Sequence, residues 1–102
     1  MLYLHRDTVT VSGGSVASVT LNVHDGLVRQ LLVRALTSGT TVFRADLTDS
    51  RNTIIRRNYA YHEGEINDVN SGFPLQGTTV VNVTNASATD TFAIVLAVEE
   101  LH

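Results

Sequence analysis

Apolar and polar residues alternate with a period of two along most of this chain. The clearest run is 92–98, in which every second residue from Phe92 to Val98 is a large apolar one. Residues 17–23 and 43–47 alternate in the same way. This period is typical of β-strands that lay one face against a hydrophobic core. The pattern therefore predicts an all-β protein.

Clusters of Gly, Asn, Asp and Ser interrupt the alternation and predict turns between the strands. The segment 63–76 has little regular pattern and is predicted to be a long connection, which a short strand at 65–69 could interrupt. No linker or repeat divides the chain, so residues 1–102 are expected to form one antiparallel β-sandwich, jelly-roll-like or immunoglobulin-like, of about seven to eight strands. The strands are expected at 2–11, 16–23, 27–36, 41–48, 53–61, 78–84 and 90–99.

The segment 27–36 allows two interpretations. As an amphipathic helix it would have Asp25 as N-cap and Gly39 just past its C-terminus. We favour a strand, because the segments on both sides are strongly strand-like. As a strand it is apolar on both faces, and so is 92–98. Strands covered on both sides lie centrally in a sheet or beneath another subunit, so we expect a homo-oligomer, a trimer or a dimer.

Composition excludes several classes of function. The chain has a net charge of −3, whereas a sequence-independent nucleic-acid binder needs a basic surface. It contains no Cys, which excludes disulfides and thiolate sites. No apolar run is long enough to span a membrane, and the first residues lack the features of a secretory signal. We therefore expect a soluble protein, made in a cytoplasm, with no nucleic-acid or membrane partner.

The sequence offers little catalytic chemistry. The four His are scattered and show no spacing of a metal site, so each is predicted to lie on the surface: His5, His24, His62 and His102. Asp46, Asp49 and Asn52 could offer oxygens to Ca²⁺, but a turn held by local hydrogen bonds explains them better. Glu63 and Glu65 are interpreted as solvated turn carboxylates rather than an acid–base pair. We predict a protein that is not an enzyme and has no catalytic, cofactor or metal site.

One segment, 54–61, is a candidate contact surface. As a strand it places Arg57, Tyr59 and Tyr61 on one face and Arg56 on the other. Arg and Tyr are enriched at interface hot spots, although solvated Arg and capping Tyr side chains would explain the same residues. The neighbouring segment 62–76, expected to be an irregular loop, would add Phe73. We predict that these residues contact a partner, for which an acidic protein surface would suit the two Arg.

Four segments resemble small virion proteins of tailed bacteriophages: 21–26, 43–49, 77–87 and the closing 92–100. The resemblance implies a jelly-roll-like or immunoglobulin-like sandwich that decorates or cements a capsid, or that sits in a tail or baseplate. It carries no catalytic positions. The implied partner is the major capsid protein or another virion protein, and the implied location is the virion. The alternative function is a carbohydrate-binding or adhesion module that uses the Tyr and Arg strand.

Overall fold

A computed structural model describes residues 1–23 and 25–100 as eight β-strands without a helix. The all-β prediction is confirmed. In the part of the chain that is described, no helix is long and apolar enough to cross a membrane. The strands are β1 (Leu2–Val11), β2 (Val16–Leu21), β3 (Gly26–Ala35), β4 (Val42–Thr48), β5 (Ile54–Tyr61), β6 (Glu65–Leu75), β7 (Thr79–Asn85) and β8 (Asp90–Glu100).

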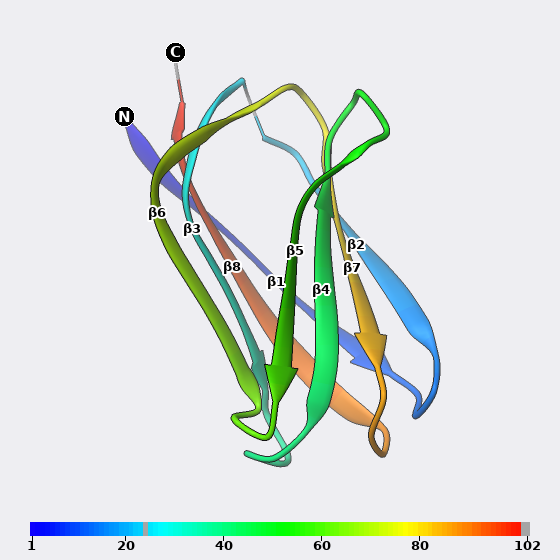
Figure 1. The fold of residues 1–102 in the computed structure, drawn as a ribbon. Helices are drawn as coiled ribbons and strands as arrows, with labels where there is room; N and C mark the ends of the chain where they lie inside the picture. Colours follow the sequence, from blue (N-terminus) through cyan, green and yellow to red (C-terminus); the bar gives the residue numbers. More distant parts are fainter. Residues whose placement is uncertain (24, 101–102) are drawn as a thin grey trace.

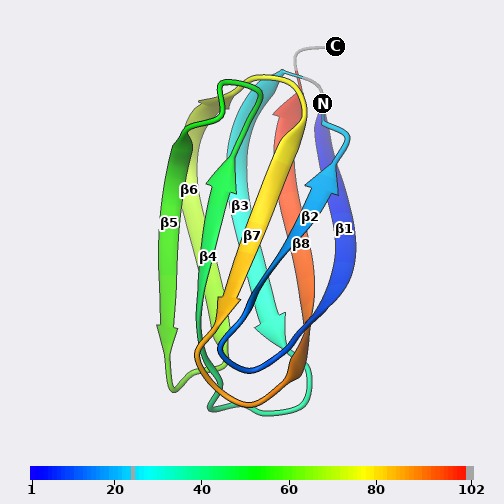
Figure 2. The ribbon, with the colours of Figure 1, turned by 90° about the vertical axis from the view of Figure 1, so that its right-hand side faces the viewer.

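The strands form two antiparallel four-stranded sheets that face each other, as Figures 1 and 2 show. Their orders are β1-β8-β3-β6 and β2-β7-β4-β5. In each of the pairs β1–β8, β2–β7, β3–β6 and β4–β5, the two strand numbers add up to nine. This is the nesting of one long antiparallel ribbon rolled around a core, which is a jelly roll. The strand order thus selects the jelly-roll alternative over the immunoglobulin-like one.

The ambiguous segment 27–36 is a strand. It forms most of β3, which lies beside β8 in the middle of its sheet. The two strands that are apolar on both faces are therefore the two central ones, as expected. The helical alternative is wrong because both neighbours offer β3 hydrogen-bonding partners along its length.

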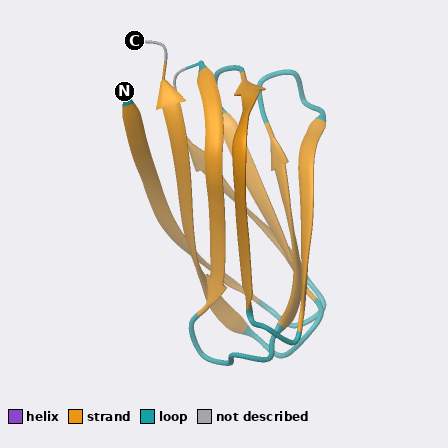
Figure 3. Ribbon diagram, turned by 60° about the vertical axis from the view of Figure 1, so that its left-hand side comes forward, coloured by secondary structure: helices purple, strands orange, loops and turns teal. Residues whose placement is uncertain are grey.

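The long irregular connection expected at 63–76 is wrong, although the short strand considered at 65–69 lies within the strand found there. Residues 65–75 form β6, an edge strand that pairs with β3 (Figure 1). Figure 3, coloured by secondary structure, shows strands joined by loops and no helix among the described residues. The register of this pair shifts between Val28 and Gln30 of β3, because Arg29 alone stands against residues 70–72 of β6. Gly72 has a φ of +116°, which favours glycine. These irregularities interrupt the alternation of β6, because they change which residues face the core.

The core lies between the sheets and consists of the inward-facing residues of both. At its centre the ring of Phe43 from β4 packs against that of Phe92 from β8, with the ring centroids 4.8 Å apart. Both side chains are almost completely buried. This contact joins the central strands of opposite sheets, so it fixes how the two layers sit on each other.

Candidate partner-binding surface

The candidate residues lie on and beside β5, which is the edge strand of its sheet. Pairing with β4 places Tyr59 opposite Arg44 and Arg57 opposite Asp46, with the side chains of each pair on the same face. This is the outer face of the β2-β7-β4-β5 sheet, because the intervening Ala45 and Ala60 are buried in the core. We name the exposed group Arg44, Arg57, Tyr59 and Tyr61 the tyrosine surface.

An ion-pair cluster around Asp46 holds the two Arg side chains of the tyrosine surface in place. The Arg57 guanidinium donates to both oxygens of the Asp46 carboxylate, at 2.8 and 3.3 Å. Arg44 Nε lies 3.2 Å from the same carboxylate. Asp46 is thus a nearly buried anion between two partly exposed cations. The arrangement leaves positive charge at the surface and restricts how the two Arg side chains can move.

The two tyrosines form an aromatic platform. Their rings are stacked, with centroids 5.6 Å apart and an interplanar angle of 8°. Tyr59 is 50% exposed and Tyr61 is 59% exposed. Beside them lies a shallow, mainly apolar hollow of about 270 Å³ that also involves Val42, Arg44 and Thr84. An exposed aromatic pair next to an apolar hollow is suited to bind another molecule.

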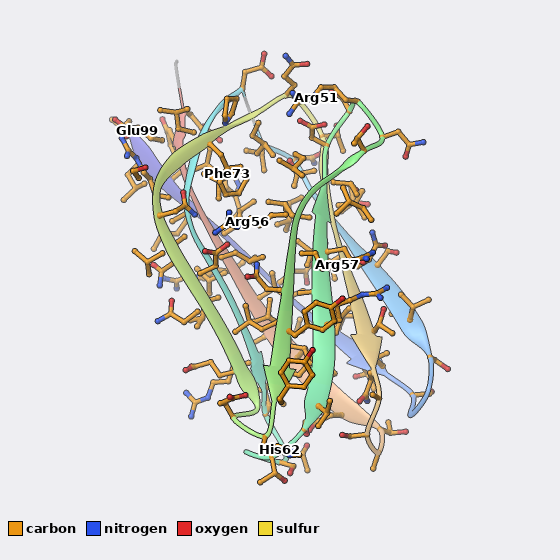
Figure 4. The ribbon with its side chains drawn as sticks, in the orientation of Figure 1. Arg51, Arg56, Arg57, His62, Phe73 and Glu99 are labelled. Atoms are coloured by element: carbon orange, nitrogen blue, oxygen red, sulfur yellow. The ribbon has the colours of Figure 1, made fainter. Side chains whose placement is uncertain are left out.

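Arg56 has a different environment from Arg57. It points to the other side of β5, toward β6 of the facing sheet, as Figure 4 shows. Its guanidinium donates to both oxygens of the Asp68 carboxylate, at 2.7 and 3.0 Å, and lies 5.6 Å from the centroid of the Phe73 ring. Asn58 donates to Asp68 as well. We call Arg56, Asn58, Asp68 and Phe73 the edge clasp, because they connect the two sheets along their open side.

The structure therefore divides the predicted residues into two groups. Arg57, Tyr59 and Tyr61 share the tyrosine surface, whereas Arg56 and Phe73 belong to the edge clasp. Phe73 was expected in an irregular loop. It lies instead in β6, where it packs against the core. Arg56 and Arg57 do not present one cationic pair to an acidic partner, because each is already bound to its own carboxylate on opposite faces of β5.

Three charged residues of these two sites were not among the predicted contact residues: Arg44, Asp46 and Asp68. Arg44 and Asp46 alternate with the buried Phe43, Ala45 and Leu47, so the period of β4 already placed them on its outer face. Pairing 42–48 with 54–61 as a hairpin would have brought them to Tyr59 and Arg57. For Asp68 the signal was weaker, since its segment was considered only as a possible short strand at 65–69, without a partner strand.

The other candidate chemistry does not converge. Asp46 lies on the sheet face, whereas Asp49 holds the turn after β4 by accepting from the N–H of Arg51. The described residues contain no group of three or more His, Asp or Glu that could hold a metal ion. His5 is partly buried, with its Nε2 3.0 Å from a carboxylate oxygen of Glu100, so it is less exposed than expected, whereas His62 is exposed. His24 and His102 lie outside the described residues.

Three buried or partly buried aspartates are used to hold the structure. The hydrogen bonds from Arg56 are the main reason why the pKa of Asp68 is lowered. Burial alone would raise the pKa of Asp49, but bonds from Arg51 and from the N–H of Gln76 outweigh it and lower the pKa. For Asp90, burial is likewise outweighed by donors from Thr37 and other residues of the neighbouring loops, and its pKa is also lowered.

This use of the aspartates predicts acid sensitivity. When the pKa of a carboxyl group is lower in the folded protein than its usual value of 3.8, the unfolded chain binds more protons in the range between them. The contribution of these three aspartates to the free energy of unfolding should therefore be constant above about pH 5. It should fall as the pH decreases through and below about 4. Urea unfolding from pH 7 to pH 3 measures this. The Asp68→Asn variant should lose the part of this pH dependence that comes from the edge clasp. An unchanged pH profile in that variant would contradict the role given to Asp68.

Comparisons with known proteins establish the fold and leave the function open. No protein-family model and no curated protein sequence matches the chain. Among solved structures, the Yersinia pseudotuberculosis-derived mitogen is similar over 100% of this chain and 91% of its own, with 14% identity and a TM-score of 0.63. PirA is similar over 89% and 92%, with 10% identity and a TM-score of 0.59. Aeromonas hydrophila PliG, a periplasmic inhibitor of g-type lysozyme, is similar over 94% and 86%, with 12% identity and a TM-score of 0.55. At these identities the likeness shows a shared β-sandwich and nothing about activity.

Proposed function

We propose that this chain is a non-enzymatic structural protein of a virus particle, specifically a capsid decoration or cement protein of a tailed bacteriophage. It would bind the major capsid protein or another virion protein through the tyrosine surface. The observation that carries the proposal is the stacked pair Tyr59 and Tyr61, about half exposed, beside an apolar hollow on an otherwise polar sheet face.

Two further observations support this function. Four shielded carboxylates, those of Asp46, Asp49, Asp68 and Asp90, accept hydrogen bonds from Arg or from turn residues, so they are engaged in holding the structure together rather than poised for proton transfer. The segments that resemble phage virion proteins include β4 and β7, the two strands that carry Arg44, Asp46 and Thr84. A role in binding uses these features without requiring a catalytic cleft.

The function is tested with virions of the source phage prepared without this protein. Added wild-type protein should co-sediment with them and contribute extra density in negative-stain images. Tyr59→Ala should weaken this binding by about 1–3 kcal/mol, because it removes one ring of the stacked pair at the centre of the contact. Titration of the protein against a fixed amount of particles measures the loss.

Tyr3→Ala is the matched control, because Tyr3 is an exposed tyrosine of the other sheet. It should bind like the wild type. Equal weakening by both variants, or normal binding of Tyr59→Ala at low and at high salt, would place the contact elsewhere. Absence of any binding of the wild type to the particles would reject the virion function itself.

A second candidate function is glycan recognition by the same surface. Exposed aromatic rings can stack on sugars, and the hollow beside Tyr59 and Tyr61 offers Arg44 and Thr84 as hydrogen-bonding groups. A glycan array decides between the two candidates. Binding of a defined glycan that is lost in Tyr59→Ala, with no binding to virions, would favour an adhesion module.

A further inference from the structure

The outer face of the β1-β8-β3-β6 sheet is unusually apolar for a surface. The positions that alternate with the core residues of the central strands include Val95 of β8 and Leu32 of β3, which lie side by side. On the edge strands the outward positions include Leu2 and Leu4 of β1 and Val69 of β6, all more than 50% exposed. We name this surface the leucine face; its apolar members are Leu2, Leu4, Leu27, Leu32, Val69, Pro74, Ala93, Val95 and Ala97.

The opposite outer face shows what a solvated sheet looks like in this protein. On the β2-β7-β4-β5 sheet the corresponding rows join Ser18 to Asn82 and Asn82 to Asp46. Apart from the tyrosine surface it is mostly polar. Antiparallel sheets commonly keep one face polar toward water, so an apolar outer face indicates that another surface covers it.

The register of the strands makes the leucine face complementary to itself. Neighbouring positions across the sheet run Leu4, Ala97, Gln30, Val69 in one row and Arg6, Val95, Leu32, Asn67 in the next. A twofold axis parallel to the strands, between β8 and β3, exchanges the ends of each row. It therefore places Leu4 of one copy opposite Val69 of the other, and Val95 opposite Leu32.

The charges of the leucine face fit the same arrangement. Arg29 and Glu99 form an ion pair within one copy. The twofold axis also places Arg6 in β1 of one copy opposite Asn67 in β6 of the other. Glu65 lies two residues before Asn67, on the same face of β6. Arg34 and Glu99 also face outward, on the central strands, and Glu99 is already paired with Arg29 within each copy. The face therefore carries charges of both signs, so a second copy would not meet a surface of uniform charge.

The available area is sufficient for a specific contact. Strands spaced about 4.8 Å apart, with about nine residues each at about 3.3 Å, give the four-stranded face an area of about 570 Å². Two copies would bury about 1,100 Å², above the about 1,000 Å² that a biological interface should exceed. A flat face that matches itself closes with two copies, whereas a trimer would need two different surfaces on each copy.

We propose that two copies of this chain pack face to face through the leucine face and form a twofold dimer. The dimer is independent of the partner proposed for the tyrosine surface, which lies on the opposite side of each copy. Of the two oligomers expected from the sequence, the geometry of the face supports the dimer.

Sedimentation velocity on the full chain, from one to several hundred micromolar, tests the dimer. The wild type should reach a mass of twice 11.1 kDa within this range. The double variant Leu4→Glu, Val69→Glu should remain monomeric at a concentration at least tenfold above the wild-type midpoint. Val16→Glu is the matched control, because Val16 is 60% exposed on the other sheet, and it should dimerise like the wild type. A wild type that stays monomeric throughout, a trimer, or equal loss in both variants would overturn the proposal.

A second measurement does not depend on charged substitutions. Because the chain has no Cys, a single Val95→Cys substitution at the centre of the leucine face provides a unique attachment point for a short bismaleimide. Cross-linked dimers should form with Val95→Cys and not with Asn82→Cys, which lies on the opposite sheet. The reverse result would show that a different face is shared between copies.

Discussion

Replacing Phe92 by Ala should lower the free energy of unfolding by about 3–5 kcal/mol, the largest loss expected from a single substitution in this chain. Phe92 is completely buried and contacts Phe43 of the facing sheet. Removing its ring leaves a cavity between the two central strands and also removes the aromatic contact. Domains of this size are stabilised by about 5–15 kcal/mol in total, so the variant should be near the limit of folding.

Urea denaturation followed by far-UV circular dichroism measures this loss. Phe92→Leu fills most of the cavity and should cost clearly less, about 1–2 kcal/mol. Val16→Ala on the surface should change stability by about 0.5 kcal/mol or less. If Phe92→Ala and Phe92→Leu were equally stable, the ring would not occupy the centre of the core as described.

Replacing Asn85 by Ala should cost about 2–4 kcal/mol, because it leaves buried carbonyl groups without a donor. Asn85 is completely buried at the end of β7. Its side-chain amide donates to the carbonyl oxygens of Val11 and Ala88, and its oxygen accepts from the N–H of Ser87. One side chain thus ties the end of β1 to the connection between β7 and β8.

Equilibrium unfolding again provides the measurement, and Asn82→Ala is the control. Asn82 is also a β7 residue, but it lies on the outer face and should cost about 1 kcal/mol or less. Asn85→Asp should be no better than Asn85→Ala, since a carboxylate cannot donate to the Val11 carbonyl. Full stability of Asn85→Asp would mean that the bonds from the amide nitrogen are not important.

The strands with strict alternation were predictable from the sequence, whereas for β6 the sequence indicated only a possible short strand at 65–69. In β4, and in the middle of β7 and β8, every second residue is a buried apolar one, so the period identifies both the strand and its inner face. In β6 the inward positions include Asp68, a charged residue that no core pattern anticipates. Its burial is tolerated only because Arg56 of the other sheet reaches it, and that contact exists only in the folded chain.

The candidate surface was predictable to the same extent. Alternation alone placed Arg57, Tyr59 and Tyr61 on one face of a strand. Whether Arg56 is free or bound depends on which strand lies across the open side of the sandwich, which is long-range information. The same limit applies to the leucine face. The sequence indicated that 92–98 is apolar on both faces, but the row that has Leu4 at one end and Val69 at the other follows only from the strand order.

The nested pairing of the strands also determines how the chain must acquire its structure. The hairpin of β4 and β5 joins residues close in sequence, whereas β8 must reach back to β1 at the other end of the chain. Such distant pairings are formed late and slowly, because ordering a long loop opposes each of them. Moreover, β8 lies between β1 and β3, so β1 cannot join its sheet until β8, the last strand, is available. A growing chain on the ribosome can form the innermost hairpin early, but it can close the sandwich only once β8 has been synthesised and has emerged.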